Sequence, residues 1–266
     1  MHSRAGTIAI RTGEQLALLA VILLCWQYLP DVGFIAHRFH FMDPFFISSP
    51  SRVYSTLIDL ATGRNGSILV WSYARRTVES ALIGTAIGIV SGGLAGLLLS
   101  QSPYFSRLFQ PLLLVLNAIP RVALIPIFVI IFGPTAKASE AVAISVVFFV
   151  VFFVALEGAR SVPAQILQNA QILGASGFQT MRQVRLPYAV AWVFAVLPNA
   201  VAFGLLSVVT AEVFTGTVGM GRLLLISSST VNASLTFAVV AILGVIALVF
   251  TVAAEALKRR VLHWWV

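Results

Sequence analysis

The sequence contains few charged residues and almost no cysteine. Only 10% of its 266 residues are charged, whereas 59% are hydrophobic. A soluble domain carries about 25% charged residues, so this chain cannot cover a water-facing surface and is predicted to be a membrane protein. The single cysteine, Cys25, excludes an intramolecular disulfide and a metal site built from cysteines.

Catalytic and nucleotide-binding motifs are also missing. No G-x-x-x-x-G-K-[ST] loop occurs, and neither lysine, Lys137 or Lys258, follows a glycine, so ATP chemistry is not expected on this chain. No nucleophile and base can be paired within the apolar segments, which argues against an enzyme. His37 and His40 lie near Asp43, but a solvated loop is the commoner role for such a group, and no metal site is predicted.

The net charge of +8 comes from basic residues scattered between apolar blocks. This distribution is typical of anchors at a membrane surface and does not indicate nucleic-acid binding. A basic cluster, Lys258 to Arg260, is followed by Trp264 and Trp265, as expected where a final span leaves the bilayer. A mild excess of Lys and Arg on the side of the termini predicts that both termini are cytoplasmic.

Six apolar intervals are long enough to be candidate membrane helices, since a span needs about 20 mostly apolar residues. We therefore expect an all-α polytopic membrane protein with six transmembrane helices, forming one transmembrane domain over residues 1–266. The predicted spans are approximately 15–30, 78–101, 108–133, 138–157, 187–211 and 234–257.

Four glycines recur at every fourth position of the second predicted span. On a helix this spacing forms a groove along one face, where another helix can approach closely. A packing face is the expected role, and a moving hinge or part of a translocation path is the alternative. The residues are Gly84, Gly88, Gly92 and Gly96.

Prolines and one arginine interrupt the predicted spans. Pro120 and Pro126 lie in the third and Pro198 in the fifth, and broken helices fit a transporter better than an inert anchor. Arg121 is a charge within an apolar interval, which predicts that it faces a cavity or a partner group; a structural pair or snorkelling is the alternative. The candidate substrate-pathway residues are Pro120, Arg121, Pro126 and Asn199.

The connection between the fourth and fifth spans, residues 160–187, predicts a helix-turn-helix at the membrane surface. Ser161 is expected to cap a first helix with Pro163 in its first turn, and Gly174 to end it. A second short helix is expected to start at Ser176 and end at Pro187. Such a hairpin presents an apolar and small-residue face to a partner, or it rests on lipid headgroups.

The spacing in this connection resembles the EAA loop of ABC-importer permeases. The family pattern is Glu-Ala-Ala, three residues, Gly, nine residues, Ile, one residue, Leu-Pro; this chain has Ala170, Gly174, Val184, Leu186 and Pro187 at the corresponding positions. It departs from the pattern at Gln168 and Asn169, where the family has Glu and Ala. The departure removes an acidic group that could form an ion pair with a partner ATPase.

Further stretches are similar to the nitrate, taurine and aliphatic sulfonate branch of these permeases. They are residues 45–51, 118–126 with Phe132-Gly133, 173–176, 211–212 and 219–221. The resemblance implies a type I ABC importer permease fold with a cytoplasmic coupling helix, in a bacterial inner membrane. Glu212, at the outer end of the fifth span, is expected to be structural.

The resemblance also implies partners and contact residues. The expected partners are a second copy of this chain, two cytoplasmic ATPase subunits that hold ATP and Mg, and an external substrate-binding protein that delivers a small anionic solute. The residues expected to couple to the ATPase are Pro163, Leu167, Gln168, Asn169, Ala170, Leu173, Gly174, Ala175, Ser176, Val184, Leu186 and Pro187.

Three other classes of protein remain as alternatives. An integral-membrane enzyme would need intramembrane His, Asp or Glu clusters. A secondary transporter driven by an ion gradient would need acidic coupling residues within its spans and paired interrupted helices. A membrane scaffold would leave the ordered connection at 160–187 without a purpose.

Overall fold

The computed structural model describes residues 2–28, 47–64 and 69–262, and every regular element within these ranges is a helix. The predictions for His37, His40, Asp43 and residues 45–46 lie outside the described residues. The chain divides into two compact units, residues 1–70 with 223–242 and residues 71–222 with 243–266.

The first unit contains α1 (His2–Tyr28), α4 (Pro50–Thr62), most of α12 (Met220–Ser229) and the start of α13 (Ala233–Val261). Sequence analysis did not predict α4, although the sequence offers a local start signal: Ser49 is the extended N-cap and Pro50 occupies the first helical position. The helix ends at Gly63, whose φ of 67° allows its N–H to bond Asp59 O at 2.8 Å.

Polar and aromatic contacts hold the first unit together. Trp26 Nε1 donates to Ile47 O at 3.2 Å, and the Trp26 ring lies 5.2 Å from that of Phe237. The hydroxyls of Ser48 and Ser234 share a hydrogen bond of 2.7 Å. These contacts join α1 and the residues before α4 to the start of α13.

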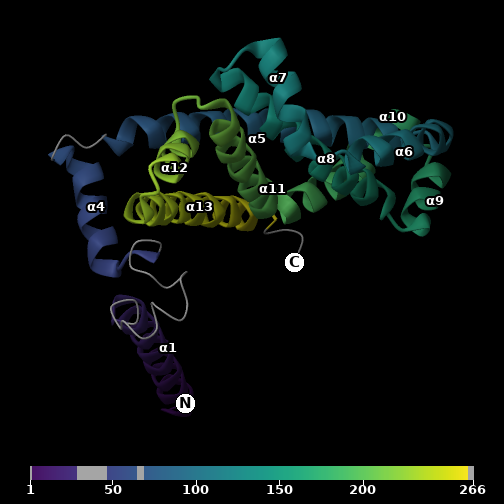
Figure 1. The fold of residues 1–266 in the computed structure, drawn as a ribbon. Helices are drawn as coiled ribbons and strands as arrows, with labels where there is room; N and C mark the ends of the chain where they lie inside the picture. Colours follow the sequence, from purple (N-terminus) through teal and green to yellow (C-terminus); the bar gives the residue numbers. More distant parts are fainter. Residues whose placement is uncertain (1, 29–46, 65–68, 263–266) are drawn as a thin grey trace. The chain divides into compact units, whose positions relative to one another are not determined.

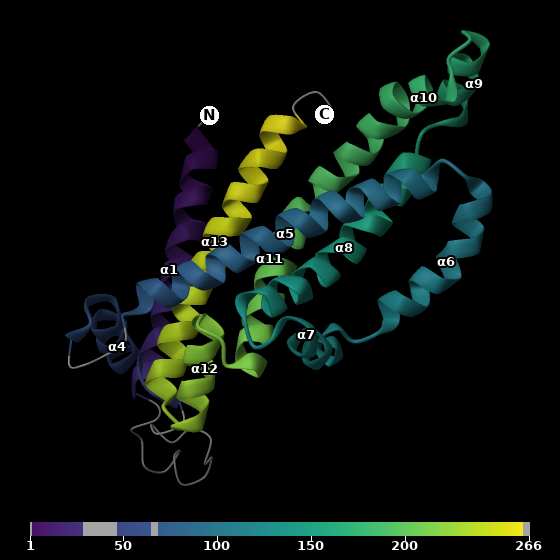
Figure 2. The same ribbon diagram turned by 90° about the horizontal axis from the view of Figure 1, so that it is seen from above.

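The second unit is built around three long helices that run alongside one another, with shorter helices at their ends (Figures 1 and 2). The long helices are α5 (Val70–Ser100), α8 (Ala136–Arg160) and α11 (Leu186–Thr215). The shorter ones are α6 (Pro103–Ala118), α7 (Ile125–Phe132), α9 (Ala164–Ile172) and α10 (Gly177–Thr180).

The four predicted packing glycines lie on the side of α5 that contacts α8. A Cβ atom on Gly84 would lie 2.7 Å from Ala143 Cβ, and one on Gly88 would lie 2.7 Å from Val147 Cβ. A Cβ on Gly92 would run into the Phe148 carbonyl oxygen, which is backbone and cannot move aside. The absence of side chains thus lets the two backbones approach more closely than any other residue would permit.

Four described helical stretches are long and apolar enough to cross a membrane: α5, α8, residues 177–215 and α13. The pair formed by α6 and residues 121–132 brings the number to five if it counts as one bent span. The first predicted span falls on a shorter apolar helix, Gly13–Tyr28 within α1. The described residues therefore show the all-helical fold, while the count of six spans stays a prediction.

The third predicted span is not one straight helix. α6 ends at Ala118, a 3-10 turn follows at Arg121–Leu124, and the two halves are bent by 85°. The cause is Pro120, because proline disfavours the helical conformation of the residue before it, and Ile119 is extended with ψ of 124°.

Two expectations for the connecting segment are wrong. Pro187 does not end a helix: Gly177–Thr215 is one helical stretch, and a π-helical turn over Met181–Arg185 precedes the proline. Proline has no N–H to donate to the carbonyl four residues earlier, and its ring collides with that carbonyl in a regular α-helix. The wider π-helical turn moves the carbonyl away, so the helix continues through Pro187. Ser161 does not cap α9 either, because its hydroxyl donates to Gly158 O at 2.8 Å and Pro163 occupies the cap position.

Candidate functional site

The hairpin of α9 and α10 lies at one end of the second unit, between the last residue of α8 and the first of α11 (Figure 2). A left-handed glycine and a backbone hydrogen bond define the turn between its two helices. Gly174 has φ of +76°, and the Ala175 N–H bonds Ala170 O at 2.9 Å. Ser176 and Gln179 then form a reciprocal capping box that starts α10.

Large apolar side chains are exposed on this turn. Ile172, Leu173 and Phe178 are 82%, 86% and 72% exposed. The polar residues Gln168 and Asn169 are also exposed on α9. Ile172, Leu173 and Phe178, together called the apolar turn, have no cover within the described chain, as is typical of a surface that contacts another protein or a membrane.

The remaining predicted coupling residues lie on α9, in the turn and in the segment that leads into α11. Leu167, Ala170, Ala175, Val184 and Pro187 are half-buried, whereas Pro163, Gly174, Ser176 and Leu186 are exposed. All twelve predicted residues thus lie between Pro163 and Pro187, and half-buried residues occur both in the turn, at Ala175, and beside the start of α11, at Val184 and Pro187.

Two arginines tie the hairpin to neighbouring helices. Arg160, at the end of α8, donates to the Ser106 hydroxyl on α6 and lies 3.6 Å from the Glu157 carboxylate. Arg185, just before α11, donates from Nη1 to Ser100 O at 2.9 Å, at the end of α5. Both ends of the hairpin are therefore joined by side-chain hydrogen bonds to α6 and to the end of α5.

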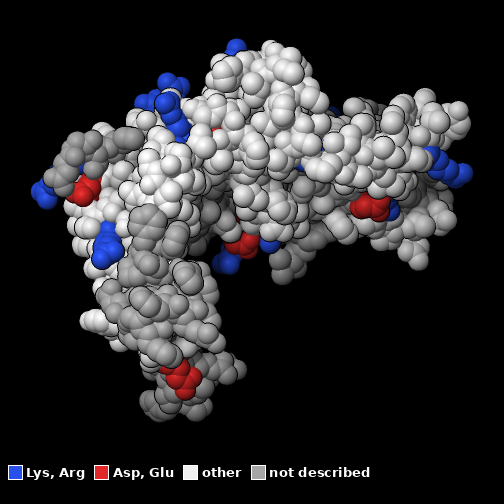
Figure 3. All heavy atoms as spheres, viewed as in Figure 1, with Lys and Arg blue, Asp and Glu red and all other residues white. Residues whose placement is uncertain are grey.

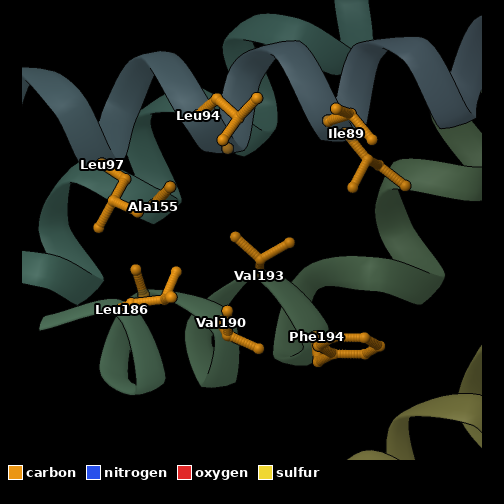
Figure 4. Close-up of a pocket in the computed structure, with 11 residues that line it drawn as sticks. Ile89, Leu94, Leu97, Ala155, Leu186, Val190, Val193 and Phe194 are labelled. Carbon is orange, nitrogen blue, oxygen red and sulfur yellow. The ribbon is translucent and has the colours of Figure 1, made fainter. Parts of the chain in front are cut away.

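An apolar pocket of about 260 Å³ lies between α5 and α11, near the anchored end of the hairpin. Figure 4 shows the side chains of Ile89 and Leu97 on α5 opposite those of Leu186, Val190 and Val193 on α11. The lining is almost entirely apolar, so this pocket offers no group that would orient a polar solute.

Arg121 lies at the break between α6 and α7. Its Nη2 donates to Asn117 O at 3.2 Å and to Asn117 Oδ1 at 3.1 Å, and its guanidinium carbon lies 4.3 Å from the centre of the Phe149 ring. Pro120 and Pro126 belong to the same break, whereas Asn199 is exposed on α11 and shares no hydrogen bond with Arg121 among the described residues. Three of the four pathway candidates therefore lie at one break, and Asn199 lies on a different helix.

A buried carboxylate joins α5 to the turn between α11 and α12. Glu212 is 2% exposed and accepts hydrogen bonds from the Thr77 hydroxyl at 2.8 Å and the Gly221 N–H at 2.9 Å. Thr77 Oγ1 in turn accepts from the Met220 N–H at 2.8 Å. A Cβ on Gly219 or Gly221 would collide with the Glu212 side chain, so both positions require glycine.

The sequence and the fold can be compared with those of known proteins. The model of the binding-protein-dependent transport system inner membrane component matches residues 84–263. The chain belongs to this family. It is an ABC-importer permease, and the family implies an ATPase and a substrate-binding protein as partners.

Individual relatives cover almost the whole permease. It is 26% identical to a probable ABC transporter permease protein of Haemophilus influenzae, over 94% of this chain and 97% of that one. It is 25% identical to the taurine transport system permease protein TauC of Escherichia coli, over 98% and 91%. The MetNI methionine ABC transporter in an inward-facing conformation shares the fold, with a TM-score of 0.61 and 19% identity over 73% of this chain and 97% of that one.

Sequence analysis did not predict that Glu212 is buried within the permease. It singled out Arg121 as a charge within an apolar interval, but Arg121 is half-buried at a helix break, and Glu212 is the charged residue that is buried among those the structure describes. The available clue was the order Ala211-Glu212 followed by Gly219 and Gly221, because glycines spaced after a carboxylate can bring backbone N–H groups close to it. The described residues include no group of three potential metal ligands.

Proposed function

We propose that this chain forms the substrate translocation pathway of an ATP-driven importer and couples to its ATPase through residues 163–187. Two copies of the chain would enclose the pathway and two ATPase subunits would hold ATP and Mg. An external binding protein would deliver a small anionic solute. In this arrangement the ATPase subunits close on ATP, and the hairpins carry that movement to the membrane helices.

The observation that carries the proposal is the apolar turn of Ile172, Leu173 and Phe178. These side chains lie beyond the C-terminal end of α8, and exposed apolar side chains that follow one another closely along the chain favour a surface that a partner protein covers. Exposed Gln168 and Asn169 offer neutral hydrogen-bonding groups beside them. An interface of this composition relies on shape and apolar contact, since the acidic group of the family pattern is absent.

An anionic solute is supported by two observations. One relative is named for the transport of taurine, a zwitterion whose negatively charged sulfonate is the oxyanion of interest here. Arg121 keeps its guanidinium at a helix break, held by Asn117 and the Phe149 ring, with no carboxylate within ion-pair distance in the described chain. Such an arginine can offer its remaining N–H groups to an oxyanion.

The experiment is to purify the tagged chain in mild detergent, identify associated proteins by mass spectrometry and assay the preparation for ATP hydrolysis. We expect a P-loop ATPase that is lost when Leu173 and Phe178 are both changed to Ser. Val231→Ser, an exposed apolar residue at the turn between α12 and α13, is the control and should retain the ATPase. An ATPase-free preparation of the wild-type chain, or equal recovery with the double variant, would refute the proposed coupling.

A further inference from the structure

The apolar pocket between α5 and α11 has a buried floor and an exposed rim. Leu97 and Ala189 in the floor are 7% and 3% exposed, whereas Val90 and Leu94 on the rim are 60% and 57% exposed. The side chains of Leu97 and Leu186 face each other across the pocket (Figure 4). Its volume of about 260 Å³ is several times the share of one water molecule, about 30 Å³, but its lining offers water almost no polar partner. In a membrane such a space is suited to hydrocarbon.

The pocket occupies the half of the membrane that lies nearer to the hairpin. Leu97 lies one turn before Ser100, the last residue of α5, and the polar residues Gln101 and Ser102 follow. Ile89, at the far end of the pocket, lies about 16 Å from Ser100 along the helix. Half of the hydrocarbon thickness is about 15 Å. The pocket therefore extends along one leaflet, which is the cytoplasmic one in the orientation that the proposed function gives.

Two arginines lie at the hairpin end of this pocket. Arg185 precedes Ala189 by four residues, so it lies on the helix face that lines the pocket. Arg182 lies one turn before Leu186 in the same helical stretch. Arg185 donates one hydrogen bond, to Ser100 O, and Arg182 makes no hydrogen bond or ion pair among the described residues. A guanidinium group has five N–H donors, so most of those in this pair can bind a further partner.

No carboxylate of the described chain pairs with these two arginines. The sequence has no acidic residue between Glu157 and Glu212 or between Glu79 and Glu140, the stretches that contain the hairpin and the hairpin ends of α5 and α11. Glu157 itself lies 3.6 Å from Arg160. Figure 3 shows a mostly uncharged surface over the long helices and basic atoms at the end where α6, α9 and α10 lie. The pocket thus joins an apolar groove to a positively charged mouth.

We propose that this pocket binds one acyl chain of an anionic phospholipid and that Arg182 and Arg185 contact its phosphate. An acyl chain matches an apolar groove that extends along one leaflet, and a phosphate accepts the charge-assisted hydrogen bonds that guanidinium groups donate. Anionic lipids make the cytoplasmic leaflet negative, which favours basic pockets between membrane helices on that side. The choice of leaflet rests on the proposed function, and the chemistry of the ligand rests on the pocket alone.

A second copy of this chain matches the pocket less well. A two-fold interface pairs a surface patch with itself, so it would place the arginines of both copies in one interface. The surrounding stretches supply no carboxylate to separate these charges. A phospholipid satisfies the apolar groove and the positive mouth with one molecule.

The test measures lipid binding by native mass spectrometry of the purified full-length chain in detergent, with the subunits that copurify. Dioleoyl phosphatidylglycerol is the anionic probe, and dioleoyl phosphatidylcholine, which has the same acyl chains, is the comparison. We expect phosphatidylglycerol to bind more tightly, and Arg182→Gln and Arg185→Gln each to weaken it about fivefold, the effect of one basic residue at an anionic lipid surface. Arg107→Gln is the control, because it removes an exposed charge on α6 outside the pocket lining, and it should bind as the wild type does.

A second pair of variants tests the position of the acyl chain. Gly93 lines the pocket, and within 4 Å its added Cβ would meet Val151 Cγ1, at 3.8 Å, so Gly93→Leu fills the groove without a backbone collision. This variant should bind both lipids severalfold more weakly. Leu98→Phe adds bulk to an exposed position of the same helix outside the pocket lining and should leave both affinities unchanged.

Three outcomes would overturn the inference. Equal binding of the two lipids by the wild type, or unchanged binding in both arginine variants, would remove the headgroup contact. Normal lipid binding by Gly93→Leu would place the acyl chain outside the pocket. Loss of a second copy from Gly93→Leu with lipid binding intact would identify the pocket as an interface between copies. An ATPase-free preparation would refute the proposed coupling alone, because lipid binding is measured without ATP hydrolysis.

Discussion

Replacing Gly174 by valine should uncouple the hairpin from its ATPase, because the turn depends on a backbone conformation that valine resists. Gly174 has φ of +76°, in the left-handed region, and no atom lies within 4 Å of where its Cβ would be. The substitution therefore causes no collision, and its whole effect is conformational. A left-handed residue with a side chain costs about 1–2 kcal/mol, and β-branched residues tolerate this region least.

A cost of this size reduces the population of the native turn by a factor of about 5–30. Leu173 and Ala175 flank the glycine, so the apolar turn would lose its arrangement while the membrane helices stay folded. The assay is ATP hydrolysis and solute uptake by the reconstituted complex, with α-helical content by circular dichroism as the measure of folding. We expect both activities to fall severalfold with unchanged helical content.

The matched control is Gly174→Asn. Asparagine also adds a side chain to open space, but it adopts the left-handed conformation far more readily than valine. It should retain most of the coupled activity. Equal activity of the valine variant and the wild type would refute the argument that the turn at Gly174 transmits movement, and equal loss in both variants would show that the added side chain itself blocks docking.

Three further predictions concern the packing of the helices and the pathway. Gly92→Ala should destabilise the permease by about 1–3 kcal/mol, because the added Cβ meets the backbone of α8. Gly93→Ala is the control and should be tolerated, because its Cβ would lie 3.8 Å from Val151 Cγ1. Thermal unfolding in detergent compares the two variants, and equal melting temperatures would contradict the close approach of the helices. Glu212→Ala should lower the free energy of unfolding by about 1–3 kcal/mol, because it leaves the Gly221 N–H without its acceptor, and Glu212→Gln should have a smaller effect. Chemical denaturation measures both variants. An unchanged midpoint in the alanine variant would show that the Glu212 hydrogen bonds do not stabilise the protein. Arg121→Ala should reduce uptake of a solute that carries a sulfonate group, such as taurine, more than Arg121→Lys does. Uptake of radiolabelled solute measures this, and equal uptake in all three proteins would remove Arg121 from the pathway.

Local sequence patterns predicted much of the membrane architecture and of the hairpin. The glycine spacing in α5 predicted a close helix contact because every fourth residue lies on one face of a helix. Gly174 and Ser176 predicted the turn and the second helix start because their conformational and capping preferences are local. Pro187 misled the analysis, since whether a proline ends a helix depends on whether the preceding turn can widen.

The sequence by itself determined that this protein is helical, lies in a membrane and resembles a permease, because hydropathy, glycine spacing and the motif at 170–187 are properties of neighbouring residues. Only the tertiary structure decided which residues separated along the chain act together. Thr77 and Glu212 lie 135 positions apart and meet in one network, and Leu97 and Leu186 line one pocket from different helices. Such pairings depend on how α5, α8 and α11 pack, which is set by long-range contacts that a single sequence does not display.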